Sequence, residues 1–507
     1  MNKIGKAYLV GAGPGEIGLI TVKGLEILKI ADVVLYDRLA NMELLQNCKK
    51  DAELVFVGKE QSKHYVTQNE TIRLLIQKVK EGKIVVRLKG GDPFIFGRGS
   101  EEAIALYEEG LQFEIIPGLT AALGASAYSG IPLTHRNIVT QCVFITAHEA
   151  PGKETTQIDW KLLASMKNTS IVIYMGASML PLICEVLIQN GMDKNTPVGI
   201  VENATLPNQR IVEGDLTNIA KIAADNNIKP PVITIISPTV ELREKIKWLE
   251  RKPLFNKRIV TTRPADQTKS LSYQLEELGA NVIQFSVIRT EISEQNLNPR
   301  NLFNNNFDWI FFTSENGVRY FFQILFKNQL DARILGGIKI GVIGKGTSRE
   351  LEKYGLKPDF VPSKFTSLDF ANEFCKQFDL KNLSILRIKG DFFKDILTEE
   401  FNKYGIKLTE YEVYKLIKDV PSQKVISDLN EKGADAFLFT SSSTVNNFFE
   451  IMNKDNAINI LNKSVVISIG PVTSEALKNN GIHSIIEAKE QSVEGMVEAA
   501  VDILRKI

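Results

Sequence analysis

Cysteine and histidine are scarce in this chain. Its 507 residues include four cysteines and four histidines. The cysteines lie far apart, and no two have the Cys-x-x-Cys spacing of zinc or redox sites. No two histidines stand four residues apart, as a metal site on one helix face would require. We therefore expect no metal site and no disulfides, and we expect reduced, mostly buried thiols in a cytoplasmic protein.

Long apolar runs and an excess of one charge are also missing. No segment reaches the roughly 20 apolar residues that span a membrane, and residues 1–6 lead into a short apolar strand that does not resemble a signal peptide. Lysine and arginine total 61 and the acidic residues total 60, so the net charge of +1 gives no reason to expect nucleic acid or an acidic membrane as partner.

The most informative stretch is Val85–Gly99, which reads VVRLKGGDPFIFGRG. It is typical of a buried strand that runs into a glycine-rich turn at Gly90, Gly91 and Asp92. Paired glycines let a ligand approach the backbone, and the carboxylate can hold a ribose or an amino group. A second glycine-rich strand end, at 11–15, lies upstream. Either loop alone could be a plain turn, but together they favour a nucleotide-like ligand at the carboxyl ends of a parallel sheet.

Strands alternate with helical patterns over residues 6–116, which favours an α/β domain with a largely parallel sheet. A second set of strand-like segments follows at 143–146, 170–174, 198–201 and 232–236. We therefore expect two α/β lobes with a cleft between them, in a domain of residues 1–247. Residues 239–255 are charged and helical in pattern, and we place a linker at 248–256.

A dinucleotide-binding Rossmann unit is the main rival interpretation. Residues 13–18, GPGEIG, match G-x-G-x-x-G, and Asp37 follows at about the expected distance. We discount this reading because Pro14 removes a backbone donor that a pyrophosphate would need. The loop at Gly90 is also left unexplained by a Rossmann unit.

Seven motifs occur in one order over residues 5–247: GAGPG at 11–15, YDR at 36–38, VGK at 57–59, RLKGGDPFIFGR at 87–98, GIPLTHR at 130–136, YMG at 174–176 and VENATLPNQR at 201–210. This half resembles uroporphyrinogen-III C-methyltransferase. The resemblance implies a two-lobed tetrapyrrole methyltransferase fold, a homodimer, and S-adenosylmethionine bound in the cleft. The implied cofactor contacts are Pro14, Gly90, Gly91, Asp92, Ile95, Thr120, Ala121, Met175 and Ala204.

The same resemblance implies Asp37 as the catalytic base and Lys59 as the proton donor. A carboxylate suits the base because the methylated pyrrole must lose a proton. A surface ion pair after a strand is the alternative reading of Asp37 and Arg38. Basic side chains that could neutralise the substrate's carboxylates, or equally lie on a solvated face, are Arg38, Arg98, His135, Arg136 and Arg210.

The second half repeats itself. Phe312–Phe322 parallels Phe439–Phe449, and Ile343–Leu351 parallels Ile469–Leu477, at a spacing of about 126 residues. A unit of that size is a domain, so we expect two similar α/β lobes. Each repeated junction is an apolar strand followed by Thr/Ser-rich residues that open a helix, which provides either ordinary caps or sites for anions.

This half, residues 257–507, resembles uroporphyrinogen-III synthase. The likeness is carried in order by RIVTTRP at 258–264, FTSEN at 312–316, EVYK at 412–415, FTSSST at 439–444 and IGPVT at 469–473. It implies two flavodoxin-like α/β lobes that exchange segments, one formed by about 258–290 and 418–507 and the other by 293–412. Tyr414 would donate a proton to the leaving hydroxyl, with an aromatic plug as the alternative. The implied substrate contacts are Thr313, Ser314, Lys345, Thr440, Ser441, Ser442, Pro471 and Thr473.

The two resemblances together predict a bifunctional enzyme. Its second half would cyclise hydroxymethylbilane to uroporphyrinogen III, and its first half would methylate that product twice to precorrin-2. One alternative is a methyltransferase that acts on a later corrinoid precursor. Another is a tetrapyrrole-binding carrier without enzymatic activity.

Overall fold

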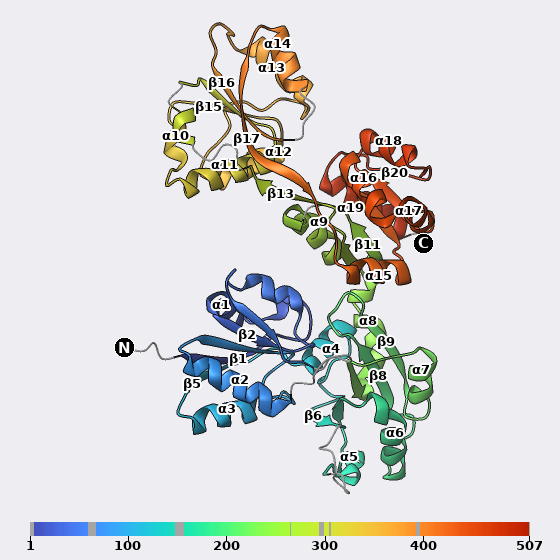
Figure 1. Ribbon diagram of the computed structural model, residues 1–507. Coiled ribbons are helices and arrows are strands. Elements are labelled where there is room, and N and C mark those ends of the chain that lie inside the picture. Colours follow the sequence, from blue (N-terminus) through green and yellow to red (C-terminus); the bar gives the residue numbers. More distant parts are fainter. Residues whose placement is uncertain are drawn as a thin grey trace. The chain divides into compact units, whose positions relative to one another are not determined.

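The computed structural model describes residues 5–58, 67–147, 157–263, 265–293, 299–303, 306–391 and 396–505. The chain divides into two compact units. Unit 1 comprises residues 1–257 and 275–281, and unit 2 comprises residues 258–274 and 282–507. Four five-stranded sheets form the framework of the two units (Figure 1). We describe each unit by itself.

The first lobe of unit 1 has a fully parallel sheet in the order β3-β2-β4-β1-β5. A Rossmann sheet places its first strand beside its second, whereas here β4 lies between them. The strands are β1 (Lys6–Gly11), β2 (Val33–Tyr36), β3 (Glu53–Phe56), β4 (Ile84–Lys89) and β5 (Gln112–Ile116). The helices are η1 (Ile17–Leu19), α1 (Val22–Ile30), η2 (Met42–Asn47), α2 (Gln68–Lys80) and α3 (Gly99–Glu108).

The second lobe of unit 1 has a mixed sheet in the order β6-β7-β10-β8-β9, in which only β6 and β7 pair in parallel. Strand β9 was not predicted, because four of the six residues in its RIVEGD sequence are charged or glycine and it lacks an apolar run. The strands are β6 (Gln141–Thr146), β7 (Thr169–Tyr174), β8 (Pro197–Glu202), β9 (Arg210–Asp215) and β10 (Val232–Ile236). The helices are α4 (Ala121–Ser129), α5 (Trp160–Ser165), η3 (Ala177–Met179), α6 (Leu180–Gln189) and α7 (Ile219–Asp225).

The segment after β10 packs closely on unit 1. It forms the short helices η4 (Pro238–Leu242), α8 (Arg243–Ile246) and η5 (Leu249–Arg251). Arg243 is buried and forms ion pairs with Glu213 and Glu250. Trp248 Nε1 donates to the carbonyl oxygen of Ala127 at 2.8 Å. Residues 248–256, where we placed the linker, thus include a short helix that is anchored to unit 1.

Unit 2 contains two sheets with similar strand orders. The first sheet has the order β12-β11-β18-β19-β20, which is the 2-1-3-4-5 order of flavodoxin-like folds. In the second sheet, β17-β16-β14-β15 corresponds to β12-β11-β18-β19 of the first sheet, and β13 pairs antiparallel to β17 at the edge. Strands β13 and β17 run toward the connection between the lobes (Figure 1).

The strands of unit 2 are β11 (Arg258–Thr261), β12 (Asn281–Gln284), β13 (Ile288–Ile292), β14 (Trp309–Phe312), β15 (Lys339–Val342), β16 (Ile385–Gly390), β17 (Leu408–Lys418), β18 (Ala436–Phe439), β19 (Val465–Ser468) and β20 (Ile486–Glu487). Its helices are α9 (Ala265–Glu277), α10 (Pro299–Leu302), α11 (Glu315–Lys327), η7 (Ala332–Leu335), α12 (Lys345–Glu352), α13 (Ser367–Gln377), α14 (Ile396–Lys403), α15 (Gln423–Lys432), α16 (Ser442–Met452), α17 (Lys454–Leu461), α18 (Pro471–Asn479) and α19 (Val493–Leu504).

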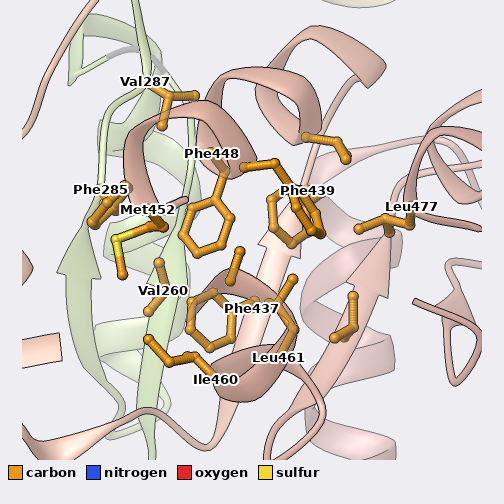
Figure 2. Packing of buried hydrophobic residues seen from close by; sticks show 14 of the residues in the cluster. Val260, Phe285, Val287, Phe437, Phe439, Phe448, Met452, Ile460, Leu461 and Leu477 are labelled. Carbon is orange, nitrogen blue, oxygen red and sulfur yellow. The ribbon is translucent and has the colours of Figure 1, made fainter. Parts of the chain in front are cut away.

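Aromatic side chains fill the cores of unit 2. In the first lobe, Phe437 and Phe439 of β18 and Phe285 surround Phe448 of α16, with ring centroids 5.2 to 5.5 Å from that ring (Figure 2). Val445 and Met452 each lie about one helical turn from Phe448, so the three side chains share the buried face of α16. In the FTS motif at 439–441, Phe439 thus packs in this core from β18, and Ser441 caps α16, the helix that carries Phe448.

The four cysteines are free thiols, but only Cys184 is buried: Cys48 and Cys375 are half-buried and Cys142 is exposed, so the expectation of mostly buried thiols was wrong. Cys142 lies on β6, an edge strand of its sheet. Among the residues that the structure describes, no cluster of three potential ligands could hold a metal ion. No helix in the described ranges is long and apolar enough to cross a membrane.

Candidate active sites

The two glycine-rich loops contact each other at the carboxyl end of the first sheet. Gly13 N–H donates to Gly91 O at 3.2 Å, and Gly91 N–H donates to Gly13 O at 2.8 Å. Both glycines are left-handed, with φ of 81° and 68°, a conformation that a side chain would strain. A third glycine, Gly118, packs so closely that an added Cβ would lie 2.3 Å from Gly91 O. Three backbones therefore converge where the sequence predicted a ligand site.

Asp92 organises these loops. Its Oδ1 accepts hydrogen bonds from the backbone N–H groups of Phe94 and Ile95 at 2.8 and 3.2 Å, and its Oδ2 accepts one from Gly118 N–H at 3.0 Å. The loop after β2 joins the same group, because Asn41 Nδ2 donates to Gly15 O at 2.8 Å. Both oxygens of Asp92 thus contact protein donors, so this carboxylate shapes the loop in addition to any ligand contact.

Asp37, the predicted catalytic base, follows β2 and is held by an ion network. Its Oδ2 accepts a hydrogen bond from Arg87 Nη2 at 3.2 Å, and its Oδ1 accepts one from Leu39 N–H at 3.1 Å. Arg87 Nε also donates to Glu102 at 3.1 Å, and the side chain of Glu102 is completely buried. The Asp37 side chain remains 24% exposed. The carboxylate is therefore fixed at two points and still accessible.

Lys89 completes this network and was not among the predicted site residues. Its Nζ donates to both oxygens of Glu102 at 2.9 and 3.1 Å, and Gln68 Nε2 also donates to Glu102 at 3.1 Å. Burial, together with the nearby Arg87, lowers the pKa of the Lys89 amine. The sequence did contain a signal for Lys89. Arg87 and Lys89 are two residues apart, so both cations lie on the same face of a strand that is otherwise apolar.

The predicted cofactor contacts from the second lobe adjoin these loops. Thr120 Oγ1 lies 2.7 Å from the hydroxyl of Tyr174, which also accepts a hydrogen bond from Ala122 N–H at 3.1 Å. Burial raises the pKa of Tyr174. The residue after it, Met175, is 51% exposed with a φ of 54°. Tyr174 was quoted in a motif but not predicted as a site residue, and its hydroxyl fixes the start of α4.

Left-handed residues other than glycine gather in these loops, and such strained positions often mark functional sites. Ala204 lies between two of them, Asn203 and Thr205. Thr205 Oγ1 accepts a hydrogen bond from Glu16 N–H at 3.0 Å, which links the loop of Ala204 to the first glycine-rich loop. Pro14 packs on Gly124 of α4, where an added Cβ would lie 2.6 Å from Pro14 Cγ.

The residues at these loops suit S-adenosylmethionine. A Cβ added to Gly91 would come into ordinary van der Waals contact with Ala121 N at 3.6 Å and Thr120 Cα at 3.8 Å, so backbone that leads into the second lobe lies directly beside the glycine pair. Ile95, 38% exposed, and Met175 add apolar surface there. Backbone polar groups beside apolar side chains are the usual lining of a nucleoside pocket.

The predicted basic residues do not form one cluster. Arg38 is exposed directly after Asp37, and Arg98 forms a bidentate pair with Glu101 at 2.8 Å. His135 and Arg136 lie in an exposed turn closed by the bridge between His135 and Val139. Arg210 is bound to Glu202 and to the carbonyls of Asn226 and Asn227, which gives it a structural role at the start of β9. Lys59 lies outside the described residues.

In unit 2, all four predicted junctions join the end of a parallel strand to the start of a helix: β14 to α11, β15 to α12, β18 to α16 and β19 to α18. Ser314 and Ser441 cap α11 and α16 by accepting hydrogen bonds from the N–H groups of Gly317 and Thr444 at 3.0 and 3.2 Å. Thr313, Thr440 and Ser442 adjoin these caps. At the other two junctions, Lys345 opens α12 and Pro471 opens α18, with Thr473 buried behind it.

Tyr414 lies on β17 and is only 2% exposed. Its hydroxyl is 3.3 Å from Ser314 Oγ, at the first turn of α11. Burial raises the pKa of Tyr414 above its ordinary value of 10.0. The structure thus brings together Tyr414 and Ser314, which are 100 residues apart, and makes the phenol a group that keeps its proton.

The family described as "Tetrapyrrole (Corrin/Porphyrin) Methylases" matches residues 6–220, and the family described as "Uroporphyrinogen-III synthase HemD" matches residues 269–498. "Uroporphyrinogen-III C-methyltransferase" of Bacillus subtilis (strain 168) is 39% identical over 357 residues, which cover 70% of this chain and 72% of that protein. A solved structure, uroporphyrin-III C-methyl transferase from Thermus thermophilus complexed with S-adenyl homocysteine, is 34% identical with a TM-score of 0.40 and covers 47% of this chain and 94% of that chain.

Similarity to one relative runs through both halves. "Porphyrin biosynthesis protein HemD" of Ruminiclostridium josui is 36% identical over 502 residues, which cover 98% of this chain and 98% of that protein. The chain therefore belongs to the family of tetrapyrrole biosynthesis enzymes in which an S-adenosylmethionine-dependent uroporphyrinogen-III C-methyltransferase is joined to a uroporphyrinogen-III synthase.

Proposed function

We propose that this enzyme carries out two consecutive steps. Unit 2 cyclises hydroxymethylbilane to uroporphyrinogen III, and unit 1 methylates that product twice to precorrin-2. The observation that carries the proposal is the meeting of two glycine-rich loops beside the partly exposed carboxylate of Asp37, in the same chain as the two synthase lobes. Joining both activities raises the local concentration of the intermediate.

In the methylation, S-adenosylmethionine supplies an electrophilic methyl group. The loops at Gly13, Gly91 and Thr120 would hold it, with Ile95 and Met175 along its apolar part. Asp37 accepts the proton that the methylated pyrrole carbon loses. Its fixed position at Arg87 and Leu39 supports this role, because a base acts efficiently only within hydrogen-bond reach of the proton.

In the cyclisation, Tyr414 donates its proton to the hydroxyl of hydroxymethylbilane, which leaves as water. The last pyrrole is then inverted and the ring closes. Caps at the N-termini of α11 and α16 support contacts to the substrate's carboxylates, since unpaired helix amides attract anions. Holding both ends of a linear tetrapyrrole between two lobes supplies much of the rate.

The rival function is methylation of a later corrinoid precursor. Membership in a family that joins the methyltransferase to a uroporphyrinogen-III synthase favours uroporphyrinogen III, because the second half makes that compound. The same membership argues against a carrier without activity. The homodimer and the cytoplasmic location stay predictions.

Mass spectrometry of products tests the proposal. Full-length protein supplied with hydroxymethylbilane and S-adenosylmethionine should yield the dimethylated macrocycle. Asp37→Ala should stop at uroporphyrinogen III and still bind S-adenosylhomocysteine. Unmethylated product from the wild-type protein would support the later-precursor alternative, and accumulation of only the spontaneous type I isomer would contradict the synthase assignment.

A further inference from the structure

The strand that carries Tyr414 has an irregular register at that residue. Along β16 and β17 the partners advance one by one as far as Lys389 and Glu412, but Gly390 then pairs with Tyr414. Val413 is therefore an extra residue, a β-bulge. Bulges break the alternation of side chains and re-aim the next one, and they occur often beside active sites. Accordingly, the consecutive residues Val413 and Tyr414 both lie in the same core cluster.

Gly390 provides the space into which the bulge turns the ring. A Cβ at this position would lie 2.7 Å from Cζ and 2.8 Å from Cε2 of Tyr414. Its φ is not left-handed, so the backbone conformation alone does not require glycine here. The next residue, Asp391, fixes the surrounding backbone: its N–H donates to Tyr414 O at 3.0 Å, and its Oδ1 accepts from Leu416 N–H at 3.0 Å.

A second ring lies alongside Tyr414. Tyr320 of α11 stacks on it, with centroids 5.6 Å apart and planes at 22°. The hydroxyl of Tyr320 donates toward the backbone oxygen and Oγ1 of Thr290, both at 2.8 Å. Thr290 belongs to β13 and pairs with Leu416 in β17. The stacked ring is thus anchored to the strand beside the one that carries Tyr414.

We propose that Gly390 and Tyr320 are positioning residues of the synthase reaction. They hold the Tyr414 ring so that its hydroxyl stays at Ser314, where α11 begins and the substrate is expected to bind. This inference rests on the proposed role of Tyr414 as proton donor. A displacement of about 1 Å at a reacting group can cost about a hundredfold in rate, so a methyl group at Gly390 should affect catalysis much more than binding.

Gly390→Ala in the full chain tests this, with Gly341→Ala as matched control. A Cβ at Gly341, in β15 of the same sheet, would lie 2.8 Å from a ring atom of Phe311, so both variants crowd an aromatic ring. We expect Gly390→Ala to lower the synthase kcat at least tenfold with less than a twofold change in KM for hydroxymethylbilane. Gly341→Ala should keep kcat within twofold. Equal kcat losses in both variants would overturn the inference.

The double variant Gly390→Ala/Tyr414→Phe separates positioning from general damage. It should be no slower than Tyr414→Phe alone, because Gly390→Ala acts by displacing the hydroxyl of Tyr414 and that hydroxyl is already absent. Additive losses would overturn the inference and leave the role of Tyr414 intact. Wild-type rates in Tyr414→Phe would overturn the proton-donor role itself, and the positioning role with it.

Tyr320→Leu provides an independent test should Gly390→Ala fail to fold. Its control is Tyr354→Leu, which removes another stacked ring of the same lobe, on Phe322 at 4.0 Å. We expect Tyr320→Leu to lower kcat severalfold. The same substitution should have no further effect on kcat when Tyr414 is already phenylalanine. Tyr354→Leu should leave kcat within twofold. No difference between the two variants would contradict a positioning role for Tyr320.

Discussion

At the scale of single residues, the methyltransferase site depends on charges that are balanced inside the protein. Arg87 and Lys89 are buried cations, and one fully buried carboxylate, Glu102, contacts both. Asp37 supplies a second negative charge to Arg87 and is the partly exposed member of this network. A buried charge that loses its partner is strongly destabilising, so the network constrains the position of Asp37 without needing direct contact with a ligand.

Glu102→Gln should therefore destabilise the first lobe, because two buried cations lose their shared counter-charge. We expect a loss of about 3–5 kcal/mol, reduced to the extent that Lys89, whose pKa is already lowered, gives up its proton. Hydrogen exchange of peptides covering residues 84–108 measures this loss. Glu109→Gln removes an exposed partner of Lys80 and should change little. Equal effects of the two substitutions would contradict the role of Glu102.

Tyr414 makes a prediction about pH. Because burial raises its pKa above 10.0, the phenol stays mostly protonated at pH values well below 10. The factor by which Tyr414→Phe slows cyclisation should thus be the same at about pH 7 and about pH 9. A pH–rate profile checks this. A fall in the wild-type rate with a midpoint below about pH 9, absent from Tyr414→Phe, would show a lowered pKa instead.

At the scale of elements, both units place their candidate sites at the carboxyl ends of parallel strands. In unit 1 the strands end in glycines that let separate loops pack backbone against backbone. In unit 2 they end in hydroxyl residues that cap the next helix. The repeat of about 126 residues explains the second pattern, since β14 with α11 and β18 with α16 occupy equivalent places in their lobes.

Gly118→Ala should separate the loops that meet at Gly91. The new methyl would lie 2.3 Å from Gly91 O and 2.7 Å from Gly11 Cα, and backbone atoms cannot yield without moving the loops. We expect S-adenosylhomocysteine to bind at least about tenfold more weakly by calorimetry, a loss of about 1.4 kcal/mol. Gly18→Ala is the control, because its methyl would meet only the Glu16 side chain, at 3.3 Å. Unchanged affinity in Gly118→Ala would place the ligand elsewhere.

At the scale of the whole molecule, the methyltransferase half extends beyond residue 247. Leu249 is buried, and Glu250 pairs with the buried Arg243. A fragment of residues 1–247 would lose both, whereas a fragment of residues 1–257 keeps them. Losing one buried leucine costs about 2 kcal/mol.

We therefore expect the shorter fragment to melt about 4–8 °C below the longer one. Differential scanning calorimetry of the two fragments measures this difference. Glu250→Gln in the longer fragment should reproduce part of it, since Arg243 then keeps only Glu213. Equal melting temperatures would mean that the segment after residue 247 contributes nothing to unit 1.

The sequence by itself determined the local features of this protein: the apolar strands, the glycine-rich and hydroxyl-rich strand ends, and the duplication that makes two lobes. These follow from short patterns, because a residue's backbone preference and the alternation of apolar side chains act over a few positions. Family resemblance supplied the candidate roles of Asp37 and Tyr414. Only the tertiary structure decided that β9 joins a mixed sheet, that Glu102 balances Arg87 and Lys89, and that a bulge at Val413 turns Tyr414 toward Ser314. Each depends on which distant segments meet, since pairing, burial of charge and strand register are set by the partner and not by the residue's neighbours in the chain.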